Sequence, residues 1–296
     1  MTDRVPPPQA PLAEEASAYW DRRASESSSV YWAEHQLVRE SVNRWITGEP
    51  GLWPVDALRH QWLRRSLSRG LSLGCGTGSL ERCLRRTGDC DSVDAFDLSE
   101  ASIREARRRA AEEGLDGIRY QVANCDEIRL PWKRYDIVYF HHSLHHIADP
   151  DRLLDQALRT LRPRGWLYVD EYVGPSQGEW SDETLRWARE AYDELEPALR
   201  RQPLAAPIDP ADPSEMVRSS RILPAIRERF EIVHYRPYWG NLLFPLFCAA
   251  DGGALLADGR RDLVARLVER ERELVIGGSI RAPLFAVVLA RKPRRA

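Results

Sequence analysis

A glycine-rich turn is the feature of this sequence with the clearest chemical meaning. The segment LSLGCGTGSL puts Gly74, Gly76 and Gly78 directly after a short apolar run and before a stretch with helical spacing. Glycine lets the backbone approach a ligand where a side chain would collide, and the N–H groups at a helix start attract polar ligand atoms. The pattern therefore predicts a cofactor-binding turn, with a tight turn that holds no ligand as the plain alternative.

The spacing of these glycines excludes one nucleotide-binding motif and disfavours another. The dinucleotide fingerprint requires G-x-G-x-x-G, but the sixth position here is Ser79. A P-loop requires Gly-Lys-Ser/Thr after the first glycines, and no such triplet follows. Asp97 ends the next apolar run, nineteen positions after Gly78, where a carboxylate can accept hydrogen bonds from both hydroxyls of a ribose. A helix cap is the alternative role for Asp97.

A run of histidines and a pair of carboxylates supply the other candidate chemistry. The run holds four histidines: His141, His142, His145 and His146. Histidines spaced i,i+4 can bind a metal or act as a general base, but no nearby carboxylate or thiol pattern completes a metal site, so we expect none. Asp170 and Glu171 end a later apolar run, and neighbours on a strand face opposite ways. We expect Glu171 to orient a substrate hydroxyl or a histidine and Asp170 to pack or cap; the reverse assignment stays open.

Short apolar runs alternate with helical stretches from residue 70 onwards, which predicts βαβ units and a parallel sheet. The runs expected to be strands are 71–73, 93–96, 120–122, 137–140 and 166–169, joined near the end by 230–234 and 284–290. The stretches expected to be helices are 14–23, 31–46, 55–67, 79–86, 99–113, 150–161 and 181–200. Four prolines fall within 202–213, which predicts a loop or a lid boundary there.

This texture divides the chain into five parts. We expect a disordered lead over 1–13, a helical N-terminal cap over 14–69 and a cofactor-binding core over 70–173. A substrate lid follows over 174–225, and 226–296 completes the core and the pocket. A chain of 296 residues is long enough for one large α/β domain with such additions.

Composition narrows the class of partner. The formal charge is −2 and arginine is interleaved with acidic residues, so nothing demands nucleic acid or an anionic membrane as a partner. The five cysteines form no CxxC pair. The N-terminus has no apolar signal core, and the apolar stretch 242–250 is too short to span a bilayer. We expect a cytoplasmic protein with reduced thiols.

Several segments resemble, in order, the class I S-adenosylmethionine (SAM)-dependent methyltransferases, over about residues 71–172. They are LSLGCGTGSLE, FDLSEASIREAR, the Asn124-Cys125-Asp126 stretch, YDIVYFHHSLHHI and LRPRGWLYVDEY. The resemblance implies an α/β fold: a Rossmann-like, mostly parallel seven-stranded sheet with helical N-terminal and C-terminal cap additions. It also implies SAM as cofactor and S-adenosylhomocysteine (SAH) as product.

The resemblance assigns cofactor contacts residue by residue. The amino-acid end of SAM is expected at Gly74, Cys75, Gly76 and Gly78, the ribose at Asp97 beside Leu98, the adenine at Asn124, Cys125 and Asp126, and the methionine arm at His141. For catalysis we expect His145 as the base that reaches the acceptor, with Glu171 and His142 as further candidates. Aromatic residues outside the sheet predict an apolar acceptor pocket, with walls at Tyr19, Trp20, Tyr172 and Trp239.

The acceptor is expected to be a small molecule. Methyltransferases that modify bases carry an Asp/Asn-Pro-Pro-aromatic motif where this chain has His141-His142-Ser143-Leu144, so methylation of a base nitrogen is disfavoured. Methylation of a hydroxyl in specialised metabolism is the first expectation. Another reaction on the same fold, or a SAM-binding regulator without turnover, is the alternative.

Overall fold

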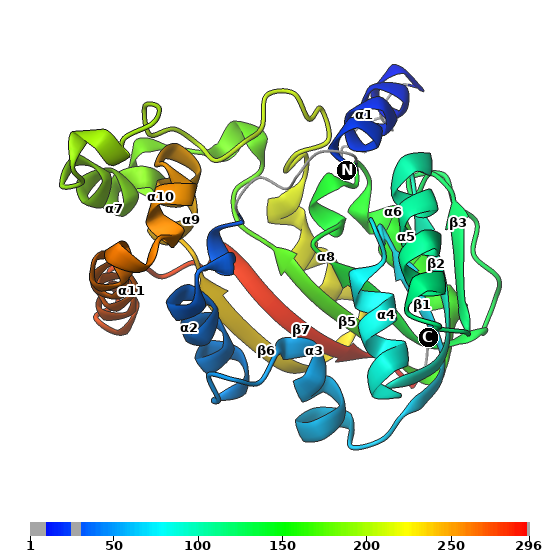
Figure 1. Cartoon of the computed structure of the whole chain (residues 1–296). Helices are drawn as coiled ribbons and strands as arrows, with labels where there is room; N and C mark the ends of the chain where they lie inside the picture. The colour runs from blue at the N-terminus through cyan, green and yellow to red at the C-terminus, as the bar shows by residue number, and fades with distance from the viewer. Residues whose placement is uncertain (1–9, 25–30, 295–296) are drawn as a thin grey trace, which may run out of the picture.

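A seven-stranded sheet crosses the centre of the computed structural model, which describes residues 10–24 and 31–294 (Figure 1). The strand order is β3-β2-β1-β4-β5-β7-β6; β7 runs antiparallel to both neighbours and the other pairs are parallel. This confirms the predicted mostly parallel sheet of seven strands. The strands are β1 (Leu67–Leu73), β2 (Cys90–Asp97), β3 (Ile118–Val122), β4 (Tyr135–His141), β5 (Leu161–Tyr172), β6 (Glu231–Trp239) and β7 (Phe285–Arg291).

The strand order reverses between β1 and β4, and open α/β sheets bind ligands beyond the carboxyl ends of the strands at such a point. Two separate apolar cores cover the two faces of the sheet. One core receives side chains from α2 (Gln36–Thr47), α4 (Ser79–Thr87) and α5 (Glu100–Glu112). The other receives them from α6 (Pro150–Thr160) and α8 (Ile222–Arg229).

The N-terminal segment differs in detail from the expectation. Helix α1 spans Ala10–Arg23, so residues 10–13 are helical rather than part of a disordered lead; residues 1–9 lie outside the described residues. The helix expected over 31–46 is interrupted by the short turn η1 (Trp32–Glu34), because His35 adopts an extended backbone and caps α2 with its side chain. The third expected helix is also short, consisting of α3 (Pro54–Ala57) and a π-helical turn, η2 (Leu58–Leu63).

The C-terminal additions gather at one end of the sheet, on the left in Figure 1. Helix α7 (Asp182–Asp193) ends before the predicted residue 200, where Pro197 starts a separate turn, η5 (Pro197–Leu199). The remaining helices are α9 (Leu243–Ala249), α10 (Gly252–Leu256) and α11 (Arg261–Ile276). Helix α11 packs against α2, so segments from both ends of the chain meet there. Within the described residues, no helix has the length and apolar character needed to cross a membrane.

Candidate cofactor and acceptor site

A cavity of about 230 Å³ opens where β1, β2, β3 and β4 end. Its wall includes residues that the sequence had assigned to the cofactor: Gly74, Gly76, Asp97, Leu98, Asn124, Cys125 and Asp126. It also includes side chains from α1, from the histidine run and from the segment 213–217. The cavity therefore joins the glycine turn to parts of the chain that are distant in sequence.

The three glycines of the turn all have positive φ, but the surroundings require them for different reasons. A Cβ on Gly74 would lie 2.4 Å from the Cβ of Ser143, and a Cβ on Gly78 would lie 2.3 Å from the Tyr120 hydroxyl. At Gly76 nothing lies within 4 Å of that position, and Gly76 lines the cavity. Gly74 and Gly78 thus permit close packing of the protein, whereas Gly76 leaves room for a ligand. Cys75 and Gly78 do not line the cavity.

The carboxylate of Asp97 lies at the cavity wall at the end of β2. Its Oδ2 accepts the Gly76 N–H at 2.7 Å, and its Oδ1 accepts the Ser99 N–H at 2.9 Å. Each carboxylate oxygen has room for a second donor, so both can still accept a hydroxyl. Burial raises the pKa of Asp97, and these backbone N–H groups oppose that change. The arrangement suits a ligand with two neighbouring hydroxyls, such as a ribose.

The segment after β3 forms the next part of the wall. The Asn124 Oδ1 accepts the Asp126 N–H at 2.9 Å, and the Asp126 Oδ1 accepts the Asp149 N–H at 3.1 Å. Burial raises the pKa of the Cys125 thiol to about 12, so this side chain is uncharged and apolar in character. An apolar thiol beside a carboxylate oxygen suits a flat ring that carries an amino group.

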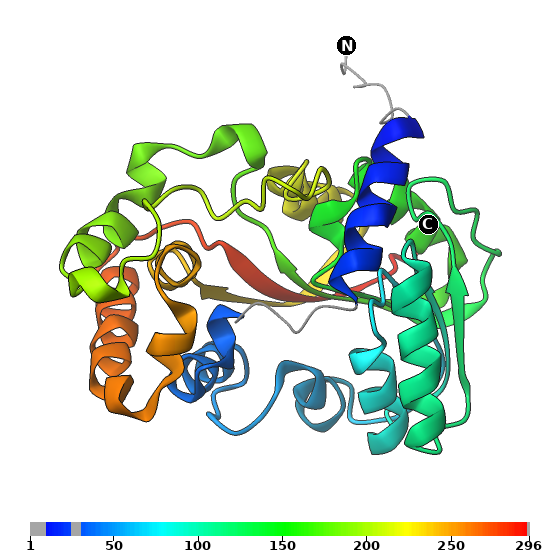
Figure 2. The ribbon, with the colours of Figure 1, turned by 45° about the horizontal axis from the view of Figure 1, so that its top comes forward.

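Helix α1 contributes Ala13, Ala16 and Trp20 to the cavity wall and packs against α5 (Figure 2). Trp20 lines the cavity, and its ring meets the His146 ring edge-on at 4.9 Å. The Asp21 Oδ1 accepts the Ser99 hydroxyl at 2.6 Å and the Ala101 N–H at 2.9 Å, which fixes α1 to the start of α5. Tyr19 does not line the cavity; its hydroxyl donates to Asp209 Oδ2 at 2.7 Å.

The histidine run is divided between the cavity and its surroundings. His142 and His146 line the cavity, whereas His141 and His145 do not. Burial lowers the pKa of His142, His145 and His146, so their rings are neutral near pH 7. The structure therefore puts His142, rather than the predicted base His145, at the cavity wall.

Glu171 is fully buried and organises this loop. Its Oε2 accepts the N–H groups of Ser143 at 2.8 Å and Leu144 at 2.6 Å, and its Oε1 accepts the Tyr172 N–H at 2.8 Å. The same Oε1 contacts His145 Nδ1. The Ser143 hydroxyl in turn donates to the Leu73 carbonyl at 2.7 Å. Glu171 thus contacts a histidine and also fixes the loop against the glycine turn.

The segment 209–217 supplies a part of the site that the sequence did not point out. Pro213, Ser214 and Val217 line the cavity, and the Ser214 hydroxyl lies 3.2 Å from His146 Nδ1. The Asp212 Oδ2 lies 3.4 Å from the same nitrogen. Glu215 Oε1 is 3.9 Å from His145 Nε2, and burial raises the pKa of Glu215 to about 8. The only sequence signal here was the proline-rich texture that predicted a lid boundary.

Like Tyr19, the predicted substrate-binding residues Tyr172 and Trp239 lie away from the cavity, so Trp20 alone of the four lines it. The Tyr172 hydroxyl donates to the Pro175 carbonyl at 2.9 Å, and its ring packs edge-on against Phe285 at 5.3 Å. The Trp239 ring lies 6.0 Å from the ring of Trp45. Neither residue lines the cavity. Both fill the packing between the sheet and the terminal additions, which the aromatic content of a sequence cannot distinguish from a pocket.

Comparisons with known proteins agree with this geometry. Residues 71–169 match the family model described as a methyltransferase domain. A ubiquinone/menaquinone biosynthesis C-methyltransferase of Hydrogenovibrio crunogenus is 31% identical over 128 residues, which cover 43% of this chain and 50% of the relative. The 27-O-demethylrifamycin SV methyltransferase of Amycolatopsis mediterranei is 28% identical over 213 residues, which cover 68% of this chain and 73% of the relative.

The fold likeness extends over the whole chain. The crystal structure of the [4+2]-cyclase SpnF has a TM-score of 0.55 at 19% identity and covers 98% of this chain and 99% of that chain. The chain spans about half the length of the first curated relatives that it matches. The glycine turn lies within the segment 71–169, which is thus similar to a methyltransferase domain, and the sheet around it has the strand order described above.

Proposed function

We propose that this protein transfers the methyl group of SAM to a hydroxyl group of a small molecule. The observation that carries the proposal is the pairing of Gly76 and Asp97 at one cavity wall, joined by a 2.7 Å hydrogen bond. Both Asp97 oxygens retain acceptor positions for the ribose, while Gly76 leaves space for the amino-acid end of SAM. Asn124, Cys125 and Asp126 would hold the adenine.

The acceptor would bind at the histidine end of the same cavity. His142 and His146 reach this wall, and the apolar side chains of Ile147 and Val217 lie nearby. In the reaction the acceptor oxygen attacks the methyl carbon; the C–O bond forms as the C–S bond breaks, and the sulfonium becomes the neutral thioether of SAH. The sulfonium methyl is already electrophilic, so the protein mainly aligns the acceptor and assists loss of its proton.

We infer two different roles for the three predicted catalytic residues. His142 lines the cavity and is the candidate for direct contact with the acceptor. Glu171 and His145 lie behind the wall, and Glu171 holds the backbone of Ser143 and Leu144. We assign these two as positioning residues for the loop 142–146. An oxygen acceptor is supported by the rifamycin relative, whose name describes methylation at an oxygen, although another relative is named as a C-methyltransferase.

Calorimetric titration with SAM and SAH tests the cofactor part of this proposal. We expect one binding site per chain for each ligand. Incubation with SAM and a panel of hydroxylated small molecules, with mass spectrometry of SAH and of methylated products, then tests the reaction. Failure of the folded protein to bind either ligand would contradict the proposal.

A turnover without methylated product would favour a different reaction. Fold alone does not fix chemistry, and one protein of this fold is described as a cyclase. SAM binding without release of SAH for any acceptor would instead favour a regulator. The panel therefore separates methyl transfer from both alternatives.

A further inference from the structure

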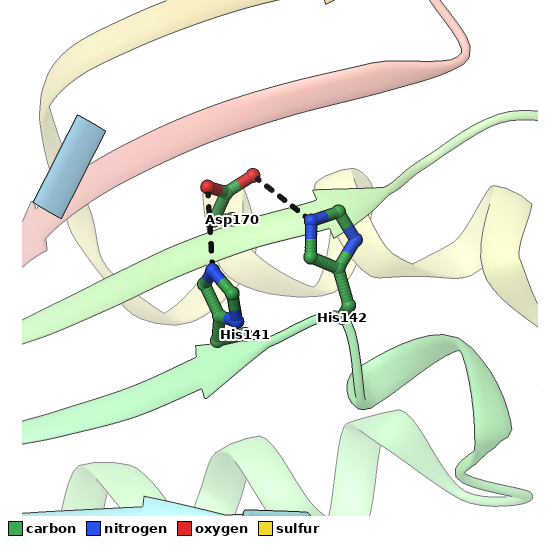
Figure 3. Close-up of side chains that lie close together, drawn as sticks. All are labelled: His141, His142 and Asp170. Atoms are coloured by element: carbon green, nitrogen blue, oxygen red, sulfur yellow. Dashed lines mark ion pairs between the residues drawn. The ribbon is translucent and has the colours of Figure 1, made fainter. Parts of the chain in front are cut away.

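Three side chains that the cofactor does not require converge beside the cavity (Figure 3). His141 is the last residue of β4, His142 follows it, and Asp170 lies on the neighbouring strand β5, in register with His141. The His141 Nε2 lies 3.9 Å from Asp170 Oδ2, and the His142 Nε2 lies 3.8 Å from Asp170 Oδ1. One ligand atom from each residue lies within 4.8 Å of the other two.

The backbone at His142 makes this convergence possible. Successive side chains of a strand point to opposite faces, so His141 and His142 would normally diverge. His142 instead has φ = +50°, a left-handed conformation that is uncommon for residues other than glycine. Its N–H donates to the Asp170 carbonyl at 2.8 Å, which holds the turn against β5. Such backbone strain often occurs at functional sites.

We propose that His141, His142 and Asp170 bind a divalent transition-metal ion. Two imidazole nitrogens and one carboxylate oxygen favour Zn²⁺, Fe²⁺, Co²⁺ or Ni²⁺ over Mg²⁺ and Ca²⁺. Ligand atoms about 2.1 Å from a shared ion lie roughly 3 to 3.5 Å apart, so side-chain shifts of under about 1 Å complete the site. The Tyr238 hydroxyl donates to Asp170 Oδ1 at 2.8 Å, a contact that orients the carboxylate as outer-shell partners of metal ligands do.

A second group of histidines and a carboxylate is a weaker candidate. His145, His146 and Glu215 also lie within 4.8 Å of one another. In this group His145 Nδ1 already contacts Glu171 and His146 Nδ1 lies near the Ser214 hydroxyl, so only the Nε2 atoms remain for an ion. Among the described residues, no hydrogen bond reaches the ring nitrogens of His141 or His142. Their nitrogens are therefore free to bind an ion.

The location of this site suggests that the ion activates the acceptor hydroxyl, an inference that rests on the proposed function. His142 is both a ligand and part of the cavity wall, so an ion here lies beside the acceptor end of the cavity. Three protein ligands leave positions open for an acceptor oxygen. A bound ion lowers the pKa of a coordinated hydroxyl, whose proton passes to solvent before the oxygen attacks the methyl carbon. His142 would then serve as a ligand instead of a free base.

The sequence had predicted no metal because no carboxylate accompanied the histidines. The missing ligand, Asp170, is 28 residues further along the chain and had been assigned to packing or capping. Strand pairing between β4 and β5 brings it to His141. The proposed metal site thus depends on the register between strands β4 and β5 and on the left-handed backbone at His142.

Titration of the protein with Co²⁺, followed by its visible d–d absorption bands, tests the site without SAM or an acceptor. Competition with Zn²⁺ then gives the affinity for that ion. His141→Ala and Asp170→Asn remove ligands, and His141 is partly exposed, so its variant is the one least able to disturb folding. His60→Ala is the matched control, because His60 is exposed and distant in sequence from the site. Glu215→Gln tests the second group.

We expect one Co²⁺ per chain in the wild-type protein, with an affinity reduced about 100-fold or more in His141→Ala and in Asp170→Asn. His60→Ala and Glu215→Gln should bind Co²⁺ as the wild type does. Calorimetry with SAM reports whether each variant is folded. If Asp170→Asn is not folded, the Co²⁺ affinity of His141→Ala alone tests the site.

Absence of Co²⁺ and Zn²⁺ binding by the wild type, or unchanged binding in His141→Ala, would overturn the proposal. Loss of Co²⁺ binding in Glu215→Gln but not in His141→Ala would show that the ion binds at the second group. That result would also overturn the proposal. Because no methyl acceptor is needed, failure here is distinguishable from failure of the proposed methyl transfer.

Discussion

The two ends of the cavity are built in different ways. At the cofactor end, defined by residues 74–78, 97–98 and 124–126, short turns after β1, β2 and β3 present backbone groups and one carboxylate. At the acceptor end, defined by residues 141–147, 170–171 and 209–217, buried carboxylates from distant segments hold histidines and backbone in place.

The two ends should therefore respond differently to substitution. The cofactor end depends on glycines and on local hydrogen bonds, so changes there should act mainly on SAM affinity. The acceptor end depends on buried side chains that satisfy several backbone groups at once, so changes there should also lower the free energy of unfolding.

Glu171→Gln should give the largest loss of stability. The glutamine amide cannot accept hydrogen bonds through its nitrogen, so buried N–H groups of Ser143, Leu144 or Tyr172 lose a partner. We expect the free energy of unfolding in urea to fall by about 3–5 kcal/mol. Glu183→Gln, at an exposed glutamate of α7, is the control and should change little. A loss below about 1 kcal/mol would mean that the loop does not depend on Glu171.

Glu81→Gln tests a buried acid that adjoins the cofactor end, in the first turn of α4. Burial raises the pKa of Glu81 to about 7 in the folded protein. The folded state therefore holds a proton that the unfolded chain releases near pH 4.5. The free energy of unfolding that protonated Glu81 contributes is fully present below pH 4.5. It is lost as the pH rises through 7, because the buried carboxyl then ionises.

The variant should remove this pH dependence. We expect Glu81→Gln to be more stable than the wild type by roughly 2–3 kcal/mol at pH 8, with little difference at pH 5. Urea unfolding at both pH values measures the change. If the wild type and Glu81→Gln were equally stable at pH 8, ionisation of the buried Glu81 would cost nothing, which would contradict this prediction.

Asp97→Ala should act on the cofactor without a comparable effect on folding. It removes the acceptors for the ribose hydroxyls, and we expect SAM binding to weaken by about 1–3 kcal/mol in calorimetry. Asp91→Ala, at the exposed start of the same strand, is the control. Unchanged SAM affinity in Asp97→Ala would remove the ribose assignment.

Trp20→Ala should have the smallest effect, because α1 is held by further contacts of Tyr19 and Asp21. The loss of the edge contact with His146 should speed SAM dissociation about 5-fold to 10-fold, equivalent to about 1 kcal/mol. Trp132→Ala, at a tryptophan that is 70% exposed, is the control. Stopped-flow measurement with both variants would show whether α1 retains the cofactor.

Local patterns predicted the sheet, and several of the residues expected to bind the cofactor meet at one cavity. Each strand of the sheet was anticipated by a short apolar run, and for strands such as β4 and β7 burial on both faces explains the uninterrupted apolar sequence. Gly76, Asp97 and the 124–126 segment lie at the cavity because turns after parallel strands meet at one sheet edge. The helix expected over 181–200 was too long, because Pro197 starts a new turn where helical periodicity alone had suggested continuation.

The acceptor end depended on contacts that no local pattern encodes. His145 was chosen as the base, yet the tertiary structure turns it towards Glu171 and puts His142 and His146 at the cavity wall. Tyr172 and Trp239 carry the same aromatic signal as Trp20, but packing makes them part of the interior. The acids of 209–217 reach the histidines only because the chain folds back over the sheet.

The sequence by itself determined the α/β class, the strands and the glycine turn, because periodicity and turn chemistry act over a few neighbouring residues. Only the tertiary structure decided which histidine faces the cavity and that Asp170 lies between His141 and His142. The physical reason is that side-chain convergence depends on strand register and on a single left-handed residue, and both are fixed by packing across the sheet.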